Sequence, residues 1–517
     1  MRLQAGLLLS KLYTPRRGSA TSPRRALESR SGTWLRCAPC AKSRGTNTGM
    51  IASTLYDKLW NAHTIRVYDD GTTLLYIDEH FIHEVTSPQA FGLLSREGLD
   101  IHDCRSTVAM PDHNVPTDSM RRRRVWPCGQ VARLHSNCER HCIRCSPVHG
   151  RRQGIVHVAG PEQGATLPSG SVACGDSHTS THGALGALAQ GIGTSDVANV
   201  LLARSIRQKR NRSLLISLEG RLRPGCCAKD VALHMASMVG AGGGAGYCME
   251  LGGGSIGRMP LEGRMSVCNM SIEAGARFSL SGADNPMLNY MQARGARRHY
   301  HRAPCKMSMD ATSDALAQHS RMVAMRADRI EPQITWGTAP YMSTSVRGSV
   351  PNPLAISDPR DRSEAEAALD YMSLDPGMPL ACLGVDFVFI GSCTNSRSED
   401  IRMAARVVSR LGGRVHRRIR GAIVVPGSMA SKAQLEREGV GGILTRAGFE
   451  WREPGCSMCI AMNSDQLAYR ERCVSTSNRS FECRQGPMSR THLASPATAA
   501  LAAITGSVCD ASSIAWS

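Results

Sequence analysis

The sequence predicts an α/β fold, because short apolar segments typical of strands alternate with segments of helical periodicity along most of the 517 residues. At about 150 residues per domain, a chain of this length is expected to form roughly three domains. Its 50 glycines suit an α/β enzyme whose turns and ligand loops need positive φ or close backbone approach. No apolar run reaches the roughly 18 residues of a membrane-spanning helix, so we expect a soluble protein.

The first 49 residues differ in composition from the rest of the chain. They are rich in Arg and Ser, contain one acid, Glu28, and show no sustained apolar period. Such a composition is typical of a transit peptide or a non-native extension, so we predict that residues 1–49 are disordered or targeting-like and exclude them from the fold. We expect a cytoplasmic protein, or an organellar one if this extension is a real transit peptide. Met50 opens a predicted helix over 51–60 with an early Ser or Thr cap.

The predicted elements then follow in order. We expect strands over residues 73–77, 154–159, 387–390 and 422–425. We expect helices over 89–96, at the far end of 183–207, over 400–410 and over 431–438. A helix beginning near Lys229 leads to a glycine loop over 239–246, residues 294–363 are predicted to be a connection around one sharper segment at 331–338, and the chain after 438 is predicted to be rich in loops.

Charge and cysteine content exclude some classes of protein. Much of the net charge of +19 comes from the first 49 residues and from four consecutive arginines at 121–124, which we interpret as solvated side chains rather than a nucleic-acid surface. Twenty cysteines at irregular spacing without a convincing signal peptide do not indicate a secreted disulfide framework. Reduced thiols and a metal site are the better interpretation.

Three cysteines stand in loops directly after apolar segments. Cys393 lies in Gly-Ser-Cys-Thr-Asn-Ser-Arg, and Cys456 and Cys459 lie in Pro-Gly-Cys-Ser-Met-Cys. Thiolates at the carboxyl ends of strands are typical of an iron–sulfur site in an α/β sheet, and three ligands for four irons would leave one iron free as a Lewis acid. A bare Cys-x-x-Cys is equally typical of half a zinc site or of buried thiols.

A second cysteine series has the Cys-x3-Cys-x2-Cys spacing of radical SAM enzymes. It consists of Cys138, Cys142 and Cys145. Because the surrounding stretch is rich in His and Arg and no glycine-rich SAM motif follows, we do not predict a cluster there.

The strings around Cys393 and Cys456 resemble the aconitase superfamily, and residues 453–463 resemble its isopropylmalate dehydratase large-subunit branch. The resemblance covers nearly all of residues 50–510 and includes, in order, the strings at 83–91, 154–158, 174–179 and 490–493. It implies three aconitase-like α/β/α domains around one [4Fe-4S] cluster per subunit, with Cys393, Cys456 and Cys459 as the metal ligands.

The resemblance also implies how these domains are arranged along the chain. Residues 50–280 would hold domain 1 and the start of domain 2, 281–363 the remainder of domain 2 and a connection, and 364–517 domain 3 with the cluster cysteines. We do not expect the swivel domain of single-chain aconitases within this chain. The resemblance therefore implies a separate small subunit that carries it, in a heterodimer or heterotetramer.

Dehydration of a hydroxy diacid needs an acid, a base and cationic groups for two carboxylates. The resemblance implies three carboxylate–imidazole pairs, each of which would orient the imidazole and raise its basicity: Asp112 with His113, Asp176 with His157, and Glu273 with His178. His113 would belong to the acid that protonates the leaving hydroxyl, and the other two histidines would hold the iron-bound water or hydroxyl.

The resemblance assigns two further groups of residues. The expected contacts to substrate carboxylates are Gln89, Ser177, Arg479 and Arg484. The expected surroundings of the cluster are Asn269, Asn478 and Asn395. At two nearby positions the chain departs from the family pattern, with Ser480 where Asn is usual and Cys483 where Gly is usual. In addition, region 117–152 is unusually rich in Arg, Cys and His, and region 296–325 is shortened.

The resemblance implies a hydro-lyase that interconverts 2- and 3-isopropylmalate in leucine biosynthesis. The nearest alternative is a homoaconitase or citraconate-type hydratase subunit, because the same residues serve several diacids. Two further alternatives are a catalytically impaired homologue, suggested by Ser480 and Cys483, and a homologue that binds RNA after loss of its cluster.

Overall fold

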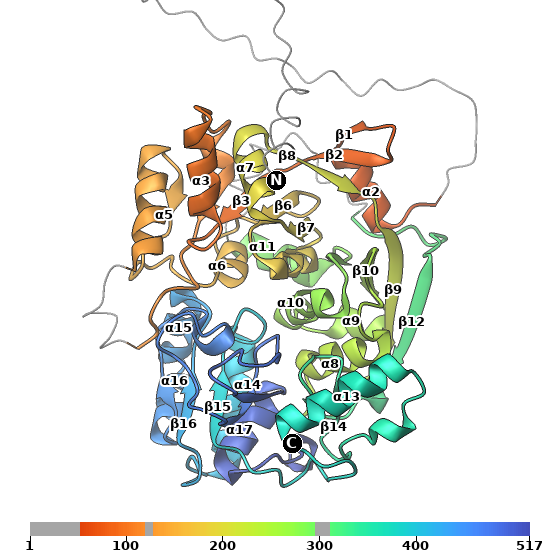
Figure 1. Ribbon diagram of the computed structural model, residues 1–517, viewed down its shortest axis with the longest axis vertical. Helices are drawn as coiled ribbons and strands as arrows, with labels where there is room; N and C mark the ends of the chain where they lie inside the picture. The colour runs from red at the N-terminus through yellow and green to blue at the C-terminus, as the bar shows by residue number, and fades with distance from the viewer. Residues whose placement is uncertain (1–51, 119–127, 295–310, 517) are drawn as a thin grey trace, which may run out of the picture. The chain divides into compact units, whose positions relative to one another are not determined.

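The structure, a computed structural model, describes residues 52–118, 128–294 and 311–516 (Figure 1). Its contacts group the chain into two units, Met1–Met50 and Ile51–Ser517, and every element named below belongs to the second. The extension predicted over 1–49 and the arginines at 121–124 lie outside the described residues. Three parallel sheets form the framework of the second unit, which confirms the predicted α/β class.

The unit begins with a capped helix, α2 (Leu55–His63). Thr54 Oγ1 accepts a hydrogen bond from Asp57 N at 3.1 Å, and Thr54 N donates to Asp57 Oδ2 at 3.4 Å. This capping box satisfies backbone N–H groups that the first helical turn leaves without partners, and it confirms the predicted Ser or Thr cap.

A small antiparallel sheet, β1-β2-β8, is built from β1 (Thr64–Val67), β2 (Thr72–Tyr76) and β8 (Ser205–Lys209).

The first parallel sheet has the strand order β5-β4-β3-β6-β7. Its strands are β3 (Glu79–Ile82), β4 (Thr107–Ala109), β5 (Arg144–Cys145), β6 (Ser171–Cys174) and β7 (Leu188–Gly191). Strand β6 is buried along its whole length, as expected for a parallel strand covered on both faces. The helical segments that link or follow these strands are α3 (Ser87–Arg96), η1 (Cys104–Ser106), α5 (Gly129–Arg140), α6 (Val156–Glu162), η2 (Ser177–Leu185) and α7 (Thr194–Ala203).

The second parallel sheet has the order β11-β10-β9-β12. Its strands are β9 (Arg212–Glu219), β10 (Tyr247–Gly252), β11 (Phe278–Ser281) and β12 (Arg321–Arg326). Between them run α8 (Ala228–Val239), α9 (Gly254–Arg258), α10 (Leu261–Met270), η3 (Ser271–Ala274) and α11 (Asn285–Ala293). After β12 come η4 (Ala327–Arg329), a hairpin of β13 (Gln333–Thr335) and β14 (Ser343–Ser345), and η5 (Pro353–Ala355).

The third parallel sheet has the order β17-β16-β15-β18-β19. Its strands are β15 (Phe387–Ile390), β16 (Gly421–Val424), β17 (Glu450–Trp451), β18 (Arg472–Ser475) and β19 (Arg490–Leu493). Its helical segments are α14 (Ser398–Leu411), α15 (Met429–Arg437), α16 (Val440–Arg446), η6 (Ser457–Cys459), α17 (Pro496–Thr505) and η7 (Ala511–Ser513). Helices α14 and α17 pack side by side in the hydrophobic core of this sheet (Figure 1).

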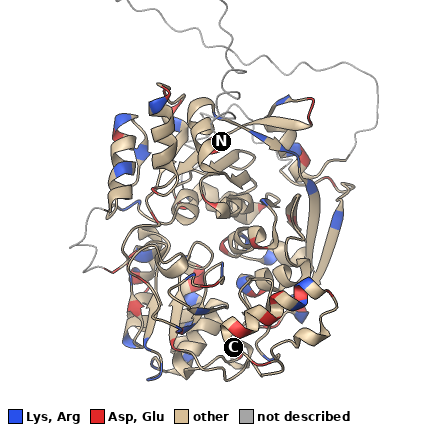
Figure 2. Ribbon diagram, in the orientation of Figure 1, with Lys and Arg blue, Asp and Glu red and all other residues tan. Residues whose placement is uncertain are grey.

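Helix α13 (Pro359–Met372) shows how the sequence pattern sets burial. Its buried residues are Ala365, Ala368, Leu369 and Met372, which recur at the three- and four-residue spacing of one helix face. Six of the other residues of the helix are acidic or basic (Figure 2). The periodicity therefore packs one stripe of α13 into the core and leaves its charged residues in water.

Two predicted elements were wrong in type or extent. Residues 154–159, predicted as a strand, contribute to helix α6, whose residues from Val156 to Pro161 are all buried. An apolar run that is buried on every side has neither the period of two nor the period of 3.6, so its pattern does not separate strand from helix. The helix predicted toward 207 ends at Ala203, where Arg204 adopts a left-handed φ of 48°, and β8 follows.

The predicted connection and the predicted loop-rich end were also wrong. Within residues 294–363, β12 pairs with β9 over six residues and so belongs to the second sheet. After residue 438 the chain contributes strands β17, β18 and β19 to the third parallel sheet and helix α17 to its core. The boundary predicted near 364 falls inside α13, and the division into domains stays a prediction.

Among the described residues, no helix combines the length and apolar character needed to cross a bilayer.

Candidate active site

Several of the predicted site residues follow the carboxyl ends of parallel strands. Asp112 and His113 come soon after β4, Asp176 to His178 after β6, Cys393 after β15, and Asn478 and Arg479 after β18. Carboxyl ends of neighbouring parallel strands meet at one edge of a sheet, where open α/β folds bind ligands. The contacts below bring residues from these loops together.

Asp176 is the centre of a cluster of imidazoles. Its Oδ2 lies 3.1 Å from His113 Nε2, and its Oδ1 lies 3.2 Å from both His157 Nε2 and His178 Nδ1. Burial alone would raise the pKa of Asp176, but the hydrogen bonds from His113 and His178 and the close imidazole of His157 hold that pKa well below its ordinary value. Asp176 is therefore a charged carboxylate that orients three histidines.

Asp112 is the second partner of His113. Its Oδ1 lies 2.6 Å from His113 Nδ1, and its Oδ2 accepts a hydrogen bond from Val156 N at 2.9 Å. Burial alone would lower the pKa of His113, but the carboxylates of Asp112 and Asp176 raise it well above 6.5. Both ring nitrogens of His113 therefore face carboxylate oxygens, and this arrangement favours the protonated imidazole that a general acid requires.

A second chain of contacts runs from His178 to a guanidinium. His178 Nε2 lies 2.8 Å from Glu273 Oε1. The same oxygen accepts from Arg479 Nε at 2.8 Å, while Arg479 Nη2 donates to Ser177 Oγ at 2.9 Å. Burial would raise the pKa of Glu273, but His178 and Arg479 lower it, so the carboxylate stays charged. The Arg479 side chain is 28% exposed, which leaves part of its guanidinium open to a ligand.

The three thiols of Cys393, Cys456 and Cys459 are all buried, at 5–6% exposure. Asn478 connects two of them, because its Nδ2 donates to Cys393 Sγ at 3.2 Å and its Oδ1 accepts from Cys459 Sγ at 3.3 Å. Asn269 Nδ2 also donates to Cys393 Sγ, at 3.3 Å. One small polar shell therefore surrounds sulfurs from two separate loops.

Backbone conformation in these loops is unusual. Ser392, directly before Cys393, has a φ of 79°, and Ser457, between the other two cysteines, has a φ of 50°. Left-handed backbone is unfavourable for residues other than glycine and concentrates at functional sites. Ser392 and Ser457 thus indicate that the two loops are shaped for the cysteines they carry.

The donor set fits a group held by thiolates. Burial raises the pKa of the Cys393 thiol, and of the Cys456 thiol, well above 9.0, so each stays protonated unless a cation replaces the proton. The two amide N–H groups that point at Cys393 Sγ are the partners that a sulfur anion accepts. Three such sulfurs would hold a metal cluster with one position left without a protein ligand.

Three predicted site residues form their hydrogen bonds with groups other than the imidazoles and the cysteine sulfurs. Gln89 is exposed, and in the orientation that satisfies its amide it donates to Val85 O at 2.9 Å and Thr86 O at 3.1 Å. Asn395 Nδ2 donates to Asp400 Oδ1 at 2.9 Å rather than to a sulfur. Arg484 is buried and its Nε donates to Cys459 O at 2.6 Å, which supports the cysteine loop.

Several contacts were not predicted from the sequence. Buried Glu84 accepts hydrogen bonds from Asp112 N at 3.2 Å and Asn114 N at 2.5 Å, and so holds the loop that carries His113. His182 Nε2 lies 3.1 Å from Nδ1 of His157. Both residues fall within or beside the motif strings, but only the folded chain shows which neighbours they hold.

The arginine of the Cys393 motif is also a support. Arg397 is 2% exposed, and it donates to Thr394 O at 2.9 Å and to His157 O at 3.2 Å. It therefore ties the Cys393 loop to the start of α6.

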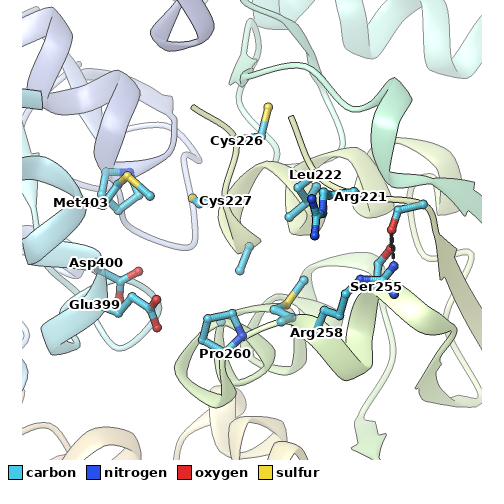
Figure 3. A pocket seen from close by; sticks show the side chains of 15 residues that line it. Arg221, Leu222, Cys226, Cys227, Ser255, Arg258, Pro260, Glu399, Asp400 and Met403 are labelled. Atoms are coloured by element: carbon cyan, nitrogen blue, oxygen red, sulfur yellow. Dashed lines mark hydrogen bonds between the residues drawn. The ribbon is translucent and has the colours of Figure 1, made fainter. Parts of the chain in front are cut away.

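A cavity of about 570 Å³ lies apart from these residues (Figure 3). It is bounded by the segments after β9 and β10 and by the first turns of α14 and α17. Arg221 and Arg258 lie on one side of the cavity, and Glu399 and Asp400 lie on the other (Figure 3). None of the predicted site residues lines this cavity, so its size does not make it the site of the chemistry.

Comparison with known protein families agrees with this arrangement. Residues 57–506 match the model of the family described as the Aconitase family (aconitate hydratase). The match covers most of the chain and includes every site residue discussed above. Members of this family are hydro-lyases and typically bind a [4Fe-4S] cluster. The chain therefore belongs to the aconitase family, and its fold and activity class are those of an aconitase-family hydro-lyase.

Proposed function

We propose that this chain is the large, catalytic subunit of a 3-isopropylmalate dehydratase, which interconverts 2- and 3-isopropylmalate by removing and re-adding water. The observation that carries the proposal is the contact of Asn478 with both Cys393 and Cys459, which joins the two cysteine loops. The choice of isopropylmalate among related diacids rests on the resemblance of residues 453–463.

We propose that Cys393, Cys456 and Cys459 hold a [4Fe-4S] cluster. When bound, such a cluster supplies a Lewis acid that polarises the hydroxyl and one carboxylate of the substrate. The buried thiols and the amide donors of Asn269 and Asn478 support this assignment.

The imidazole cluster handles the proton that the leaving hydroxyl needs. Nδ1 of His113 is occupied by Asp112 at 2.6 Å, so the transferable proton is the one on Nε2, which faces Asp176. His157 and His178, both held by Asp176, would orient the departing water by hydrogen bonds. The return reaction would use the same groups in reverse, with His113 taking the proton back.

Arg479 binds a substrate carboxylate in this proposal. Its planar guanidinium is held by Glu273 and Ser177, so it is already oriented when the ligand arrives. A preorganised fork loses little side-chain entropy on binding a carboxylate. We assign Arg484 the role of holding the Cys459 loop while contributing to the same anion-binding pocket.

We propose a small subunit as the partner that closes the site. The resemblance assigns the base that removes the carbon-bound proton, and further arginines, to the swivel domain of that subunit. The partial exposure of Arg479 supports an opening through which a second chain and the substrate reach the site.

A catalytically impaired homologue is the second candidate, and two observations favour it. Ser480 is 1% exposed and its Oγ has no hydrogen-bond partner among the described residues, at a position where the family usually has Asn. Cys483, where Gly is usual, has a left-handed φ of 59°. Both lie beside Arg479 and Arg484, so they bear on the anion pocket.

The test is anaerobic reconstitution of the chain with iron, sulfide and a small subunit, followed by an ultraviolet assay of alkene formation. Isopropylmalate, citrate, homocitrate and citramalate are compared at equal concentration. The proposal expects the highest kcat/KM with isopropylmalate and little turnover without the small subunit. A cluster signal without activity on any of the four acids would support the impaired homologue, and a preference for another acid would reassign the substrate.

A further inference from the structure

Lys229 is a buried cation beside the candidate active site. It stands in the first turn of α8 and is 0% exposed. Its Nζ donates to Ser477 O at 2.5 Å and Thr476 O at 3.1 Å, and it lies 3.9 Å from Met270 Sδ. Within the described part of the chain, no carboxylate forms an ion pair with it.

A buried ammonium needs compensation, because it has lost its hydration. Two peptide carbonyls supply partial negative charge, but they do not neutralise a full positive charge. Burial lowers the pKa of Lys229 to about 8, and negative charge on Cys459 is the strongest influence in the opposite direction. Cys227, Asp400 and Cys393 act in the same direction as Cys459, so the compensation that the fold offers comes from cysteine sulfur and from the Asp400 carboxylate.

The two carbonyls belong to the segment that carries Asn478 and Arg479. Thr476 also connects this segment to the loop of Cys393, because its Oγ1 accepts from Gly391 N at 2.9 Å and its carbonyl accepts from Ser392 Oγ at 3.3 Å. The ammonium of Lys229 thus lies where the loops after β15 and β18 meet. Movement of this point would displace both the amide that contacts the sulfurs and the guanidinium that faces the substrate.

We propose that Lys229 is a positioning residue that fixes the Thr476 and Ser477 carbonyls, thereby aims Asn478 and Arg479, and supplies the positive charge that offsets thiolate sulfur at Cys393 and Cys459. This inference rests on the proposed cluster. It assigns an electrostatic role to a residue of α8 whose hydrogen bonds go to Met270 Sδ and to two peptide carbonyls rather than to the cysteine sulfurs.

The first test replaces Lys229 by methionine, which has similar length and no charge, with Lys432→Met on helix α15 as the matched control. After anaerobic reconstitution, we measure the rate of iron loss to a chelator, the reduction potential of the cluster, and KM and kcat with the small subunit present. We expect K229M to lose iron about tenfold faster, to have a more negative potential, and to raise KM about tenfold, whereas K432M changes none of these. Unchanged iron loss, potential and KM in K229M would overturn the proposal.

A second variant separates charge from hydrogen bonding and provides for the case in which K229M does not fold. Lys229→Gln keeps an N–H donor but removes the charge, so it should keep the shift in potential and recover part of the loss in KM. Full recovery of the potential in K229Q would overturn the electrostatic part. If neither variant folds while K432M does, the residue serves folding and the positioning role is wrong.

The wild-type chain distinguishes this inference from the proposed function. If it takes up no iron and sulfide, the proposed function itself fails. If it holds a cluster and dehydrates a diacid while K229M matches it in every readout, only the role of Lys229 is wrong.

Discussion

His113 Nδ1 lies 2.6 Å from Asp112 Oδ1, and the backbone of Asp112 links this pair to the cysteine loop through a hydrogen bond from Cys456 N to Asp112 O at 2.9 Å. A single residue therefore orients the imidazole and contacts the segment that presents two thiols. The acid and the metal site of the proposed mechanism are held together through the main chain, independently of any ligand.

Asp112→Asn should lower kcat about 10²- to 10⁴-fold with little change in KM, because an amide does not hold His113 in the protonated, correctly oriented state. The measurement is the pH profile of kcat with the reconstituted complex. The exposed Asp69→Asn is the control. A D112N enzyme with wild-type kcat would show that the proton comes from elsewhere.

Cys393→Ser should abolish the stable cluster, because a hydroxyl does not replace a thiolate as an iron ligand. Iron and sulfide content and visible absorbance after anaerobic reconstitution measure the loss. Cys382→Ser is the matched control, since Cys382 is exposed and lies outside the sulfur group. Equal iron content in both variants would exclude Cys393 as a ligand.

Arg479→Lys should raise KM about 10- to 100-fold, since one ammonium cannot hold Glu273 and Ser177 and also bind a carboxylate as a planar fork. Steady-state kinetics over a range of substrate concentrations separates this from an effect on kcat. The exposed Arg360→Lys should leave both constants unchanged. A fall in kcat at constant KM would assign Arg479 to the transition state instead.

The elements that could be predicted are those with a clear pattern and clear ends. Strand β15 begins and ends at the predicted residues 387 and 390, and α14 contains the predicted helix over 400–410. Strand β12 could not be predicted, because its partner β9 lies about a hundred residues earlier and four of its six residues are exposed. Pairing over such a separation is decided by tertiary contacts rather than by local propensity.

The candidate site, too, could be predicted only in part. Motif strings identified His113, Asp176 and Arg479 by their neighbours in sequence, but no string shows that one carboxylate faces three imidazoles. The sequence around Lys229 does not indicate a role for it either, because a lysine near the start of a helix is usually exposed to solvent. Its role becomes visible only when the helix is packed against the segment at 476–477.

The pair of His63 and Asp78 should make stability depend on pH. His63 Nε2 lies 2.9 Å from Asp78 Oδ2. Burial would lower the pKa of His63, but the hydrogen bond and charge of Asp78 raise it above 6.5, whereas His63 lowers the pKa of Asp78 although burial would raise it. The histidine contribution is present below about pH 6.5 and is lost as pH rises through its raised pKa, and the carboxylate contribution is lost as pH falls through its lowered pKa.

His63→Gln should therefore destabilise most between about pH 4 and pH 6.5, by about 1 kcal/mol, and less at pH 9. The midpoint of urea unfolding, measured at pH 5.5 and pH 9 for the cluster-free chain, gives the difference. The exposed His102→Gln serves as the control. A loss of stability in H63Q that is equal at both pH values would contradict an ionic contribution from this pair.

Cys483→Gly should stabilise the chain by about 0.5–1 kcal/mol. Left-handed backbone costs an ordinary residue about 1–2 kcal/mol, and the greater freedom of glycine in the unfolded chain offsets about 0.4–1 kcal/mol of the gain. Cys483 has a φ of 59° and is exposed, and its thiol accepts only weak hydrogen bonds, from Met488 N at 3.4 Å and from the Tyr371 hydroxyl at 3.9 Å. The substitution therefore removes strain and little packing.

Cys483→Ala is the matched control for that prediction, because alanine removes the thiol but keeps a Cβ in the left-handed region. Only the glycine variant should raise the midpoint of urea unfolding. The next residue, Arg484, supports Cys459 through its carbonyl, so relief of strain at 483 should also slow the loss of iron from the reconstituted chain. Equal midpoints for the glycine and alanine variants would show that the backbone at 483 stores no strain, and the departure from the family pattern at this position would then have no effect on the cysteine loop.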